Sequence, residues 1–389
     1  MSTYPEQPGF AANPVPSADP AATRRYNRLL RRIGVVDAAL GLLLMALLLA
    51  TGWTAGVRNF AFRLAPVSHW LALFIYTAAL MLMAKAVGLG LEYYSFRIEH
   101  RYHLSTQRPG SWVWDQIKSF LVSMVFAQLL VQVMYYLIRW QPHWWWVTCW
   151  ALFLMLSVLL VQLAPLVLFP LFFRFRRLEN EELAARLAKM SERSGARVRG
   201  VYEWILSEKT RKANAALMGL GGTRRIVISD TMLASCDAEE IEAVVAHELG
   251  HHVYRHMLTG ILFQAVITFF GFWCLKLVVR WAEFAGLYAQ IDFANLPLIV
   301  LVATVISLAL LPVMNAFSRF NERQADLYAW KTLGRIEPFC SAMEKLAVQN
   351  LSERDPSRWV EALFHSHPCV GRRIRAAQEW AARRVQSQA

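Results

Sequence analysis

Two histidines and a glutamate with the spacing HExxH lie in the segment AVVAHELGHH, at His247, Glu248 and His251. On an α-helix, residues i and i+4 lie one above the other on the same face, so the two imidazoles can bind one metal ion. Glu248 lies on the same side, where its carboxylate can accept a proton from water at the metal. This pattern is typical of zinc sites that hydrolyse peptide bonds.

A chance occurrence of HExxH is the alternative, and the flanking sequence argues against it. Asp237, with Glu240 three residues later, has the pattern of a capping box at the start of a helix. Upstream, residues 179–194 have the pattern of an amphipathic helix. Residues 198–206 and 225–229 have the composition of β-strands, with a glycine-rich turn before the second.

Two further histidines, His252 and His256, follow the motif. Around a helix, His252 points about 100° away from His251. We therefore expect both additional side chains on the surface or beside the metal ligands, and not as ligands themselves.

A catalytic zinc site usually has three protein ligands and one open position, so a third ligand must come from elsewhere. In SRFNERQADLYA, at residues 318–329, Glu322 and Asp326 are again four positions apart and share one helix face. Taken alone, this pair is also common on solvated helix surfaces. Together with HExxH it predicts Glu322 as the third ligand of a Zn²⁺ ion. Asp326 would then orient a metal-bound imidazole through its other ring nitrogen.

The elements that carry these residues are expected to be attached to a membrane. Of the 389 residues, 56% are hydrophobic and 18% are charged, whereas soluble domains carry about 25% charged residues. Six apolar stretches are long enough for a bilayer span of about 20 residues. They lie near 34–55, 68–90, 118–138, 146–170, 258–280 and 296–316. The sequence thus predicts a mostly α-helical integral membrane protein.

The formal net charge of +13 does not indicate a nucleic-acid partner, because the arginines cluster at the ends of apolar segments. Basic residues predominate in alternate loops, which predicts that 91–117, 171–257 and 317–389 face the cytoplasm from an inner or plasma membrane. Lys85 and Lys276, within spans, are interpreted as snorkelling to the interface. The five cysteines form no CxxC pair and predict neither a disulfide framework nor a cysteine zinc site.

The predicted organisation has five parts. Residues 1–33 are expected to form a disordered basic tail, and residues 34–170 four membrane spans. Residues 171–257 form the first part of the hydrolytic domain, which contains HExxH. A transmembrane helical hairpin at 258–316 then leads to the second part, 317–389, which supplies the third ligand. Such a hairpin would return both motifs to the same membrane surface.

Several segments, in the same order, resemble the M48 metallopeptidases, most closely their Ste24-type CAAX prenyl protease branch. They are EYYSFRIEHRYHLSTQ after the second span, NAALMGLGGTRRIVISDTML before HExxH, the motifs HELGHH and SRFNERQAD, and HSHPCVGRRI near the C terminus. The resemblance covers roughly residues 90–380. In the first segment, His103 stands where the family usually has glycine.

This resemblance implies a gluzincin-like α+β zinc protease domain on the cytoplasmic side of a helical membrane body. It implies that His367 and Arg373 are catalytic and stabilise the charged oxygen of the tetrahedral intermediate; the alternative is a basic surface segment near the membrane. It also implies that an extended peptide binds as an added strand beside Asn214, Ala215 and Gly219. The alternative for Asn214 is a simple turn residue.

Three functional classes remain at this stage. A non-catalytic scaffold on a protease fold is disfavoured because the three ligands and Glu248 are all present. A transporter is disfavoured because the sequence contains no internal repeat. The sequence therefore predicts a zinc metalloendopeptidase that acts on peptide or protein substrates within the lipid bilayer environment. The natural substrate, the use of prenylated or CAAX-like substrates and the oligomeric state stay open.

Overall fold

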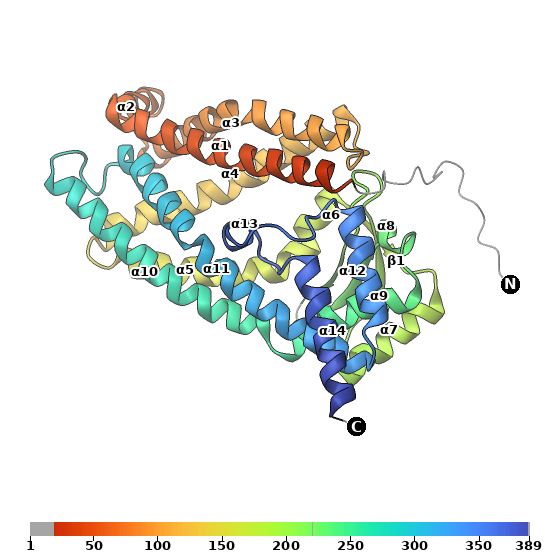
Figure 1. The fold of residues 1–389 in the computed structure, drawn as a ribbon. Helices are drawn as coiled ribbons and strands as arrows, with labels where there is room; N and C mark the ends of the chain where they lie inside the picture. The colour runs from red at the N-terminus through yellow and green to blue at the C-terminus, as the bar shows by residue number, and fades with distance from the viewer. Residues whose placement is uncertain (1–18, 220, 388–389) are drawn as a thin grey trace.

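The computed structural model describes residues 19–219 and 221–387 of the chain. Within them, six helical segments are long and apolar enough to cross a membrane, which confirms the predicted number. They are α1 (Pro20–Ala50), α3 (His69–Arg101), α4 (Pro109–Trp140), the segment Trp145–Phe172, α10 (His256–Phe284), and the segment Phe293–Leu333, most of which is α11 (Leu296–Leu333). A shorter helix, α2 (Trp53–Leu64), connects the first two. Figure 1 shows the strands collected at one end of the long helices.

The first membrane helix begins earlier than the sequence pattern predicts. Residues 20–33 are helical, so the expectation of disorder is wrong for this part of the tail. Tyr26 is buried, and Arg31 forms an ion pair with Glu353 at 3.0 Å. These contacts with distant parts of the chain stabilise a segment whose apolar side chains, at positions 26, 29, 30 and 33, repeat at helical spacing. Residues 1–18 of the predicted tail lie outside the described residues.

The fourth span is irregular near its end. After α5 (Trp145–Leu163) the chain forms a π-helical turn (Ala164–Leu168) and then α6 (Phe169–Phe172). Pro165 and Pro170 lack a backbone N–H, so the regular hydrogen-bond ladder of an α-helix cannot continue through this segment.

A four-stranded sheet has the order β1-β2-β4-β3. The strands are β1 (Arg174–Arg177), β2 (Val201–Ile205), β3 (Ala215–Met218) and β4 (Arg225–Ser229). β2 and β4 pair in parallel and lie within the two segments predicted as strands, whereas the other pairs are antiparallel. Within the described residues β3 pairs with β4 alone, so its outer side is an edge of the sheet.

The sequence pattern does not predict β1, because RFRR has a single apolar residue. The strand forms through its partners. Its Phe175 stacks on Trp204 of β2 with ring centroids 5.9 Å apart. Its Arg176 donates to the buried Glu203 at 2.7 Å. Tertiary contacts, and not local propensity, therefore fix this strand.

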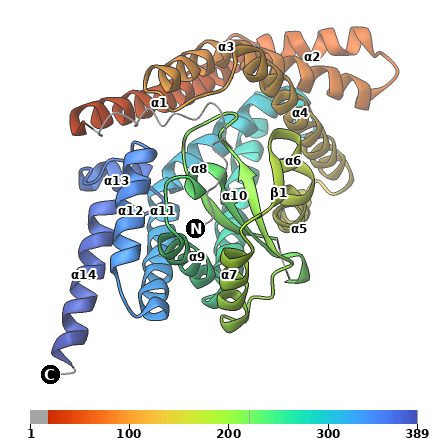
Figure 2. The same cartoon turned by 90° about the vertical axis from the view of Figure 1, so that its right-hand side faces the viewer.

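The remaining helices surround the sheet or follow the last span. They are α7 (Glu181–Arg193), α8 (Asp230–Leu233), α9 (Ala238–Val253), α12 (Glu337–Gln349), α13 (Arg358–Phe364) and α14 (Val370–Gln386). Figure 2 shows α7 and α9 against one side of the sheet and α6 on the other. Ala215, Ile226 and Ile228 alternate toward the α9 side and are buried in one apolar cluster with Leu249 of that helix.

The turn after α3 connects the membrane helices to the hydrolytic domain. His103, at the position where glycine is usual, has φ +56°, a left-handed conformation that favours glycine. Beyond it, Ser105 forms a β-bridge with Thr210, and the Leu104 carbonyl accepts a hydrogen bond from the Arg211 N–H at 2.8 Å. His103 thus adopts the same left-handed turn that glycine would form at this position.

Candidate metal centre

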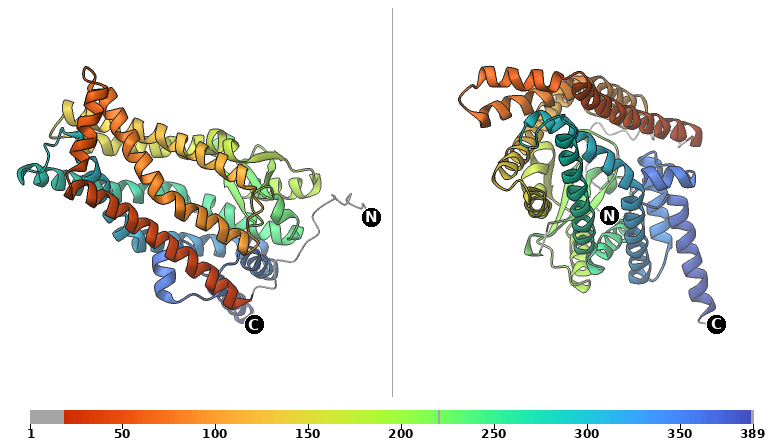
Figure 3. Two further views of the ribbon diagram at one scale, coloured as in Figure 1. Left: turned by 90° about the horizontal axis from the view of Figure 1, so that it is seen from above. Right: turned by 90° about the vertical axis from the view of Figure 1, so that its left-hand side faces the viewer.

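The expected helical hairpin is present, and it returns the chain to the HExxH helix. α10 and α11 lie against each other (Figure 3). The C-terminal part of α11 then packs on α9 at Gly250. A Cβ atom added to Gly250 would lie 2.8 Å from the Cα atom of Ala325. Only glycine permits this near-contact of two helix backbones. It brings the two motifs onto facing surfaces.

Three side chains with metal-binding atoms meet between α9 and α11. The Nε2 atoms of His247 and His251 lie 3.3 Å apart. They lie 3.2 Å and 3.3 Å, respectively, from the two carboxylate oxygens of Glu322. One such atom from each residue lies within 4.8 Å of the others. The structure therefore brings together the three residues that the sequence predicted as metal ligands.

The three side chains fit a divalent metal ion. His247 and Glu322 are both buried. Oε2 of Glu322 has no hydrogen-bond partner of acceptable geometry within the described residues, although Nδ1 of His367 lies 2.8 Å away and Nε2 of His247 3.2 Å away. A buried carboxylate oxygen without an aligned donor is costly unless a cation compensates it. Two imidazole nitrogens and one carboxylate oxygen are a ligand set of catalytic zinc.

Asp326 lies on the opposite side of the His247 ring from Glu322. Its Oδ1 is 2.8 Å from Nδ1 of His247. Arg373 donates to both oxygens of Asp326, from Nη2 at 2.6 Å and from Nε at 2.9 Å, and lies over the Phe339 ring at 5.5 Å. Two of the Arg373 donors are therefore engaged by the carboxylate of Asp326, and the catalytic role that the resemblance implies for this arginine stays a prediction.

The charges around His247 favour a cation at this position. Burial lowers the pKa of His247, but hydrogen bonds with Asp326 and Glu322 outweigh this and raise it to about 9. Burial also lowers the pKa of Arg373, and the Asp326 carboxylate reverses that effect. The carboxylates of Asp326 and Glu322 thus favour positive charge at the position of this ring.

Glu248 faces a cleft of about 460 Å³ that also contains Asn214, Ala215 and His367. The cleft lies between the start of β3 and the loop before α14. The His367 side chain is 62% exposed, and its Nδ1 lies 2.8 Å from Oε2 of Glu322. The cleft therefore combines a carboxylate, an exposed imidazole and a strand edge beside His247, one of the three predicted ligands.

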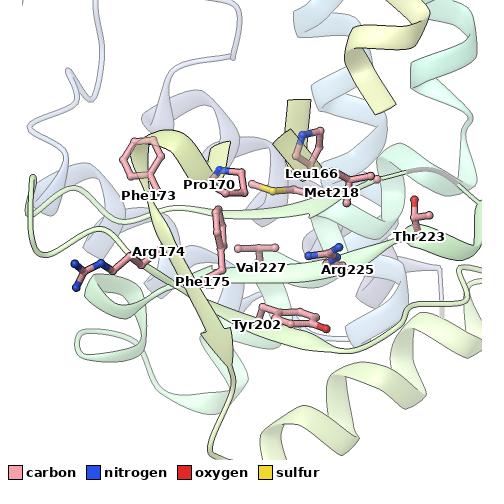
Figure 4. Close-up of a pocket in the computed structure, with 12 residues that line it drawn as sticks. Leu166, Pro170, Phe173, Arg174, Phe175, Tyr202, Met218, Thr223, Arg225 and Val227 are labelled. Carbon is pink, nitrogen blue, oxygen red and sulfur yellow. The ribbon is translucent and has the colours of Figure 1, made fainter. Parts of the chain in front are cut away.

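Gly219, predicted to contact substrate, lies outside this cleft. It follows β3 with φ +88°, and a Cβ atom there would lie 2.8 Å from the carbonyl oxygen of Thr223, so the turn requires glycine. It borders a second cavity of about 460 Å³ between the sheet and the end of the fourth span. Figure 4 shows Met218 and Val227 lining this cavity with Pro170. These strand residues alternate with those that face α9, so the second cavity is separate from the metal cluster.

Comparison with known proteins identifies the family. A family model described as "Peptidase family M48" matches residues 177–381. A second, described as "CAAX prenyl protease N-terminal, five membrane helices", matches residues 6–174. The chain belongs to peptidase family M48. It is a membrane-embedded metalloprotease with membrane helices on both sides of the HExxH motif.

Relatives of this M48 chain come from bacteria and eukaryotes. "Uncharacterized metalloprotease YhfN" of Bacillus subtilis is 30% identical over 379 residues, which covers 95% of this chain and 89% of the relative. "CAAX prenyl protease 1" of Saccharomyces cerevisiae is 27% identical over 315 residues, covering 76% and 69%. The crystal structure of S. mikatae Ste24p matches the fold with a TM-score of 0.81 at 24% identity, covering 92% of this chain and 88% of that one.

Two side chains beside the M48 metal site were not predicted in their observed roles. His256 is buried, with Nδ1 3.0 Å from Nδ1 of His251. Of the two positions expected for it, on the surface or beside the predicted ligands, it therefore takes the second. Gln324 accepts at Oε1 from Nε2 of His256 at 2.9 Å. The position of Gln324, two residues after Glu322, gives little indication in the sequence of a role near the metal site, because residues i and i+2 do not share a helix face. His252 is half-buried, and within the described part of the chain its ring forms no hydrogen bond with either residue.

Proposed function

We propose that this M48 chain is a metalloendopeptidase that uses zinc, bound by His247, His251 and Glu322. The observation that carries the proposal is that Glu248 lines the same cleft as His247, a member of this ligand cluster. When bound, zinc would polarise the peptide carbonyl group and lower the pKa of a water molecule. A set of two imidazoles and a carboxylate, without cysteine, supports zinc as the ion.

Glu248 is proposed as the general base. Within the described residues its carboxylate has no ion-pair partner within 4 Å, so both oxygens can serve a reacting group. In peptide hydrolysis it would accept a proton from the attacking water and deliver a proton to the leaving amine nitrogen. Since it is not one of the ligands, its proton transfer is separable from metal binding.

The substrate is proposed to bind as an extended strand beside β3. The backbone just before this strand is held in place, because Ala213 donates to Oδ1 of Asn350 at 2.8 Å and accepts from its Nδ2 at 3.1 Å. Asn214 is exposed, and no hydrogen bond of its side-chain amide occurs within the described residues. Its amide and the open edge of Ala215 can therefore pair with a peptide backbone.

His367 and Arg373 are proposed to have different roles. The exposed imidazole of His367 overhangs the cleft and can donate to the charged oxygen of the tetrahedral intermediate. Arg373 is a positioning residue, because its bidentate contact fixes Asp326 against His247. This assignment replaces the direct catalytic role expected for the arginine.

The active site is proposed to face the cytoplasm. The segments that adjoin the sheet end of the spans are rich in arginine, as in Arg174, Arg176 and Arg177 after the fourth span, which supports this side under the positive-inside rule. The opposite loop between α10 and α11 has no arginine or lysine from 281 to 295.

The proposal is tested with the full-length protein purified in detergent and a library of unstructured fluorogenic peptides. We expect cleavage that stops when a chelator removes metal and returns when zinc is added. A Glu248→Gln variant should retain one zinc and bind peptide without turnover, so mass spectrometry of peptides that co-purify with it would identify the substrate class. Cleavage at the wild-type rate by this variant would contradict the proposed mechanism.

A further inference from the structure

The chain breaks sharply after the HExxH helix, and the break turns His256 back toward the metal site. α9 ends at Val253 and α10 begins at His256. Between them Arg255 has φ +55°, a left-handed conformation that is uncommon outside glycine. The reversal places Nδ1 of His256 3.0 Å from Nδ1 of His251. A continuous helix would have kept these two rings on different faces.

A second contact continues this line of hydrogen bonds. Nε2 of His256 lies 2.9 Å from Oε1 of Gln324, on α11. His256 is 7% exposed, so water does not readily replace either partner. Three side chains from three helices, His251, His256 and Gln324, thus form one chain of hydrogen bonds that ends at a metal ligand.

The chemistry of the partners fixes the direction of every hydrogen bond in this chain. An amide oxygen only accepts, so Nε2 of His256 must donate to Gln324. In a neutral imidazole with its proton on Nε2, Nδ1 is an acceptor, so Nδ1 of His256 must accept a hydrogen bond from the Nδ1–H of His251. His251 then carries its proton on Nδ1 and leaves the lone pair of Nε2 directed at the ligand cluster.

We propose that His256 and Gln324 are positioning residues that hold the proton of His251 on Nδ1 and thereby keep its Nε2 available to the metal. This inference rests on the proposed function in one respect, the assignment of His251 as a ligand. The partner of a ligand ring commonly sets both its tautomer and its orientation. Here an imidazole and an amide perform that role.

The two ligand histidines are therefore supported in different ways. His247 donates from Nδ1 to the carboxylate of Asp326, a charged acceptor, whereas His251 donates to a neutral ring. Hydrogen bonds to charged acceptors are roughly twice as strong as neutral ones. His251 is accordingly the less basic ligand, and the arrangement depends on Gln324 to orient its only partner.

The test compares zinc affinity among variants of the full-length protein in detergent, by competition with a chromophoric chelator, with no measurement of cleavage. His256→Leu removes the acceptor and should weaken zinc binding about 10- to 100-fold. His256→Asn places an amide oxygen where Nδ1 lies and should restore affinity to within a few-fold of wild type. His252→Leu, at a half-buried histidine of the same segment that forms no hydrogen bond with either ring in the described part of the chain, is the matched control.

Gln324→Leu should also weaken zinc binding, by less than His256→Leu, because its effect passes through the ring. In the His256→Asn background the same change should have almost no effect, since the group that Gln324 orients is absent. The visible absorption spectrum of the cobalt-substituted protein should shift in His256→Leu and return in His256→Asn. A structural role of the ring alone would instead make the asparagine and leucine variants equally defective.

Equal zinc affinity for wild type and His256→Leu, or equal losses for the leucine and asparagine variants, would overturn the inference. Either result would leave the proposed function intact, because wild-type binding of one zinc and peptide cleavage are measured separately. A wild-type protein that bound no zinc would instead contradict the proposed function itself. The unfolding temperature of each metal-free variant identifies any variant that has lost its fold. If His256→Leu has lost its fold, the zinc affinity of Gln324→Leu is compared with that of the wild type instead.

Discussion

Asp326 holds the His247 ring by its Nδ1 atom at 2.8 Å, so that the Nε2 atom of the same ring faces the metal position. Asp326→Ala should therefore weaken zinc binding without abolishing it, by about 10- to 100-fold. Glu322→Ala removes a ligand and should leave the purified protein essentially without zinc. Metal analysis after dialysis against buffers of defined free zinc measures both effects.

This pair of variants tests which carboxylate binds the ion. The two side chains lie one turn apart on the same buried face of α11. An Asp326→Ala protein that lost zinc as completely as Glu322→Ala would show that the two carboxylates have been assigned the wrong way round.

Glu248→Ala should keep its zinc and lose peptide cleavage. General-base catalysis by a positioned side chain contributes about 100- to 10,000-fold to rate, so turnover should fall by at least that range. Zinc content and kcat/KM measured on the same preparation separate the two properties. Glu239→Ala, at an exposed glutamate of the same helix, is the matched control and should change neither. A zinc-free Glu248→Ala protein would contradict the role of this residue as a base.

His367→Ala should retain zinc and peptide binding but turn over more slowly. A donor engaged only in the transition state lowers kcat and kcat/KM together and leaves KM nearly unchanged. Loss of one such donor costs roughly 100- to 1,000-fold. Steady-state kinetics with one cleavable peptide measures this split. A kcat within a few-fold of wild type would exclude His367 from the catalytic machinery.

Glu240 should stabilise the protease domain at neutral pH and lose this effect in acid. Burial raises the pKa of its carboxyl group, but hydrogen bonds from Lys345, Ser341 and the Asp237 N–H outweigh this and lower it below the usual value. Because the pKa is lower in the folded state, the stabilisation is present above the unfolded pKa and is lost as pH falls through the folded pKa. Glu240→Gln should therefore destabilise the protein by about 1–3 kcal/mol at pH 7, and this difference should shrink below pH 4.5.

Thermal or denaturant unfolding in detergent at several pH values checks this dependence. Glu239→Gln is the control, because Glu239 is half-exposed and pairs with Arg335 at the surface, where ion pairs contribute little. A Glu240→Gln difference that stayed constant down to pH 3 would show that the charge of Glu240 does not stabilise the fold.

Single cysteines on either side of the membrane should report the orientation of the site. Leu287 is 56% exposed in the loop after α10, so Leu287→Cys should react with an impermeant thiol reagent from outside intact cells. Glu239→Cys, at the start of α9, should react only after permeabilisation. Each is compared with the wild type, whose five cysteines give the background. The opposite labelling pattern would reverse the proposed topology.

The parts of this molecule that sequence predicts well are those with a local cause. The helix of HExxH begins where Asp237 and Glu240 cap each other, as their spacing predicts. The six spans follow from the length and hydropathy of the segments. The pairing of Glu322 with the two histidines could also be predicted, because the ligand number of zinc demands a third group and few candidates have the required spacing.

The remainder depends on contacts between distant segments, which leave little trace in local pattern. β1 forms because its arginine-rich sequence pairs with Trp204 and Glu203 on the neighbouring strand β2. Arg373 lines the cleft of Glu248, but its bidentate contact with Asp326, 47 residues away in the chain, has no signal in the local sequence. The link from His251 to His256 needs the left-handed turn at Arg255, which no residue preference indicates.

The hairpin of α10 and α11 places a membrane crossing in each direction between HExxH and the third ligand. No uninterrupted stretch of chain outside the bilayer contains the complete ligand set, so the site cannot be excised as a soluble fragment. A newly made chain likewise has no working centre until both of its last spans have been inserted and α11 has emerged as far as Glu322. The proposed metal site therefore requires that both of these spans have formed and packed together.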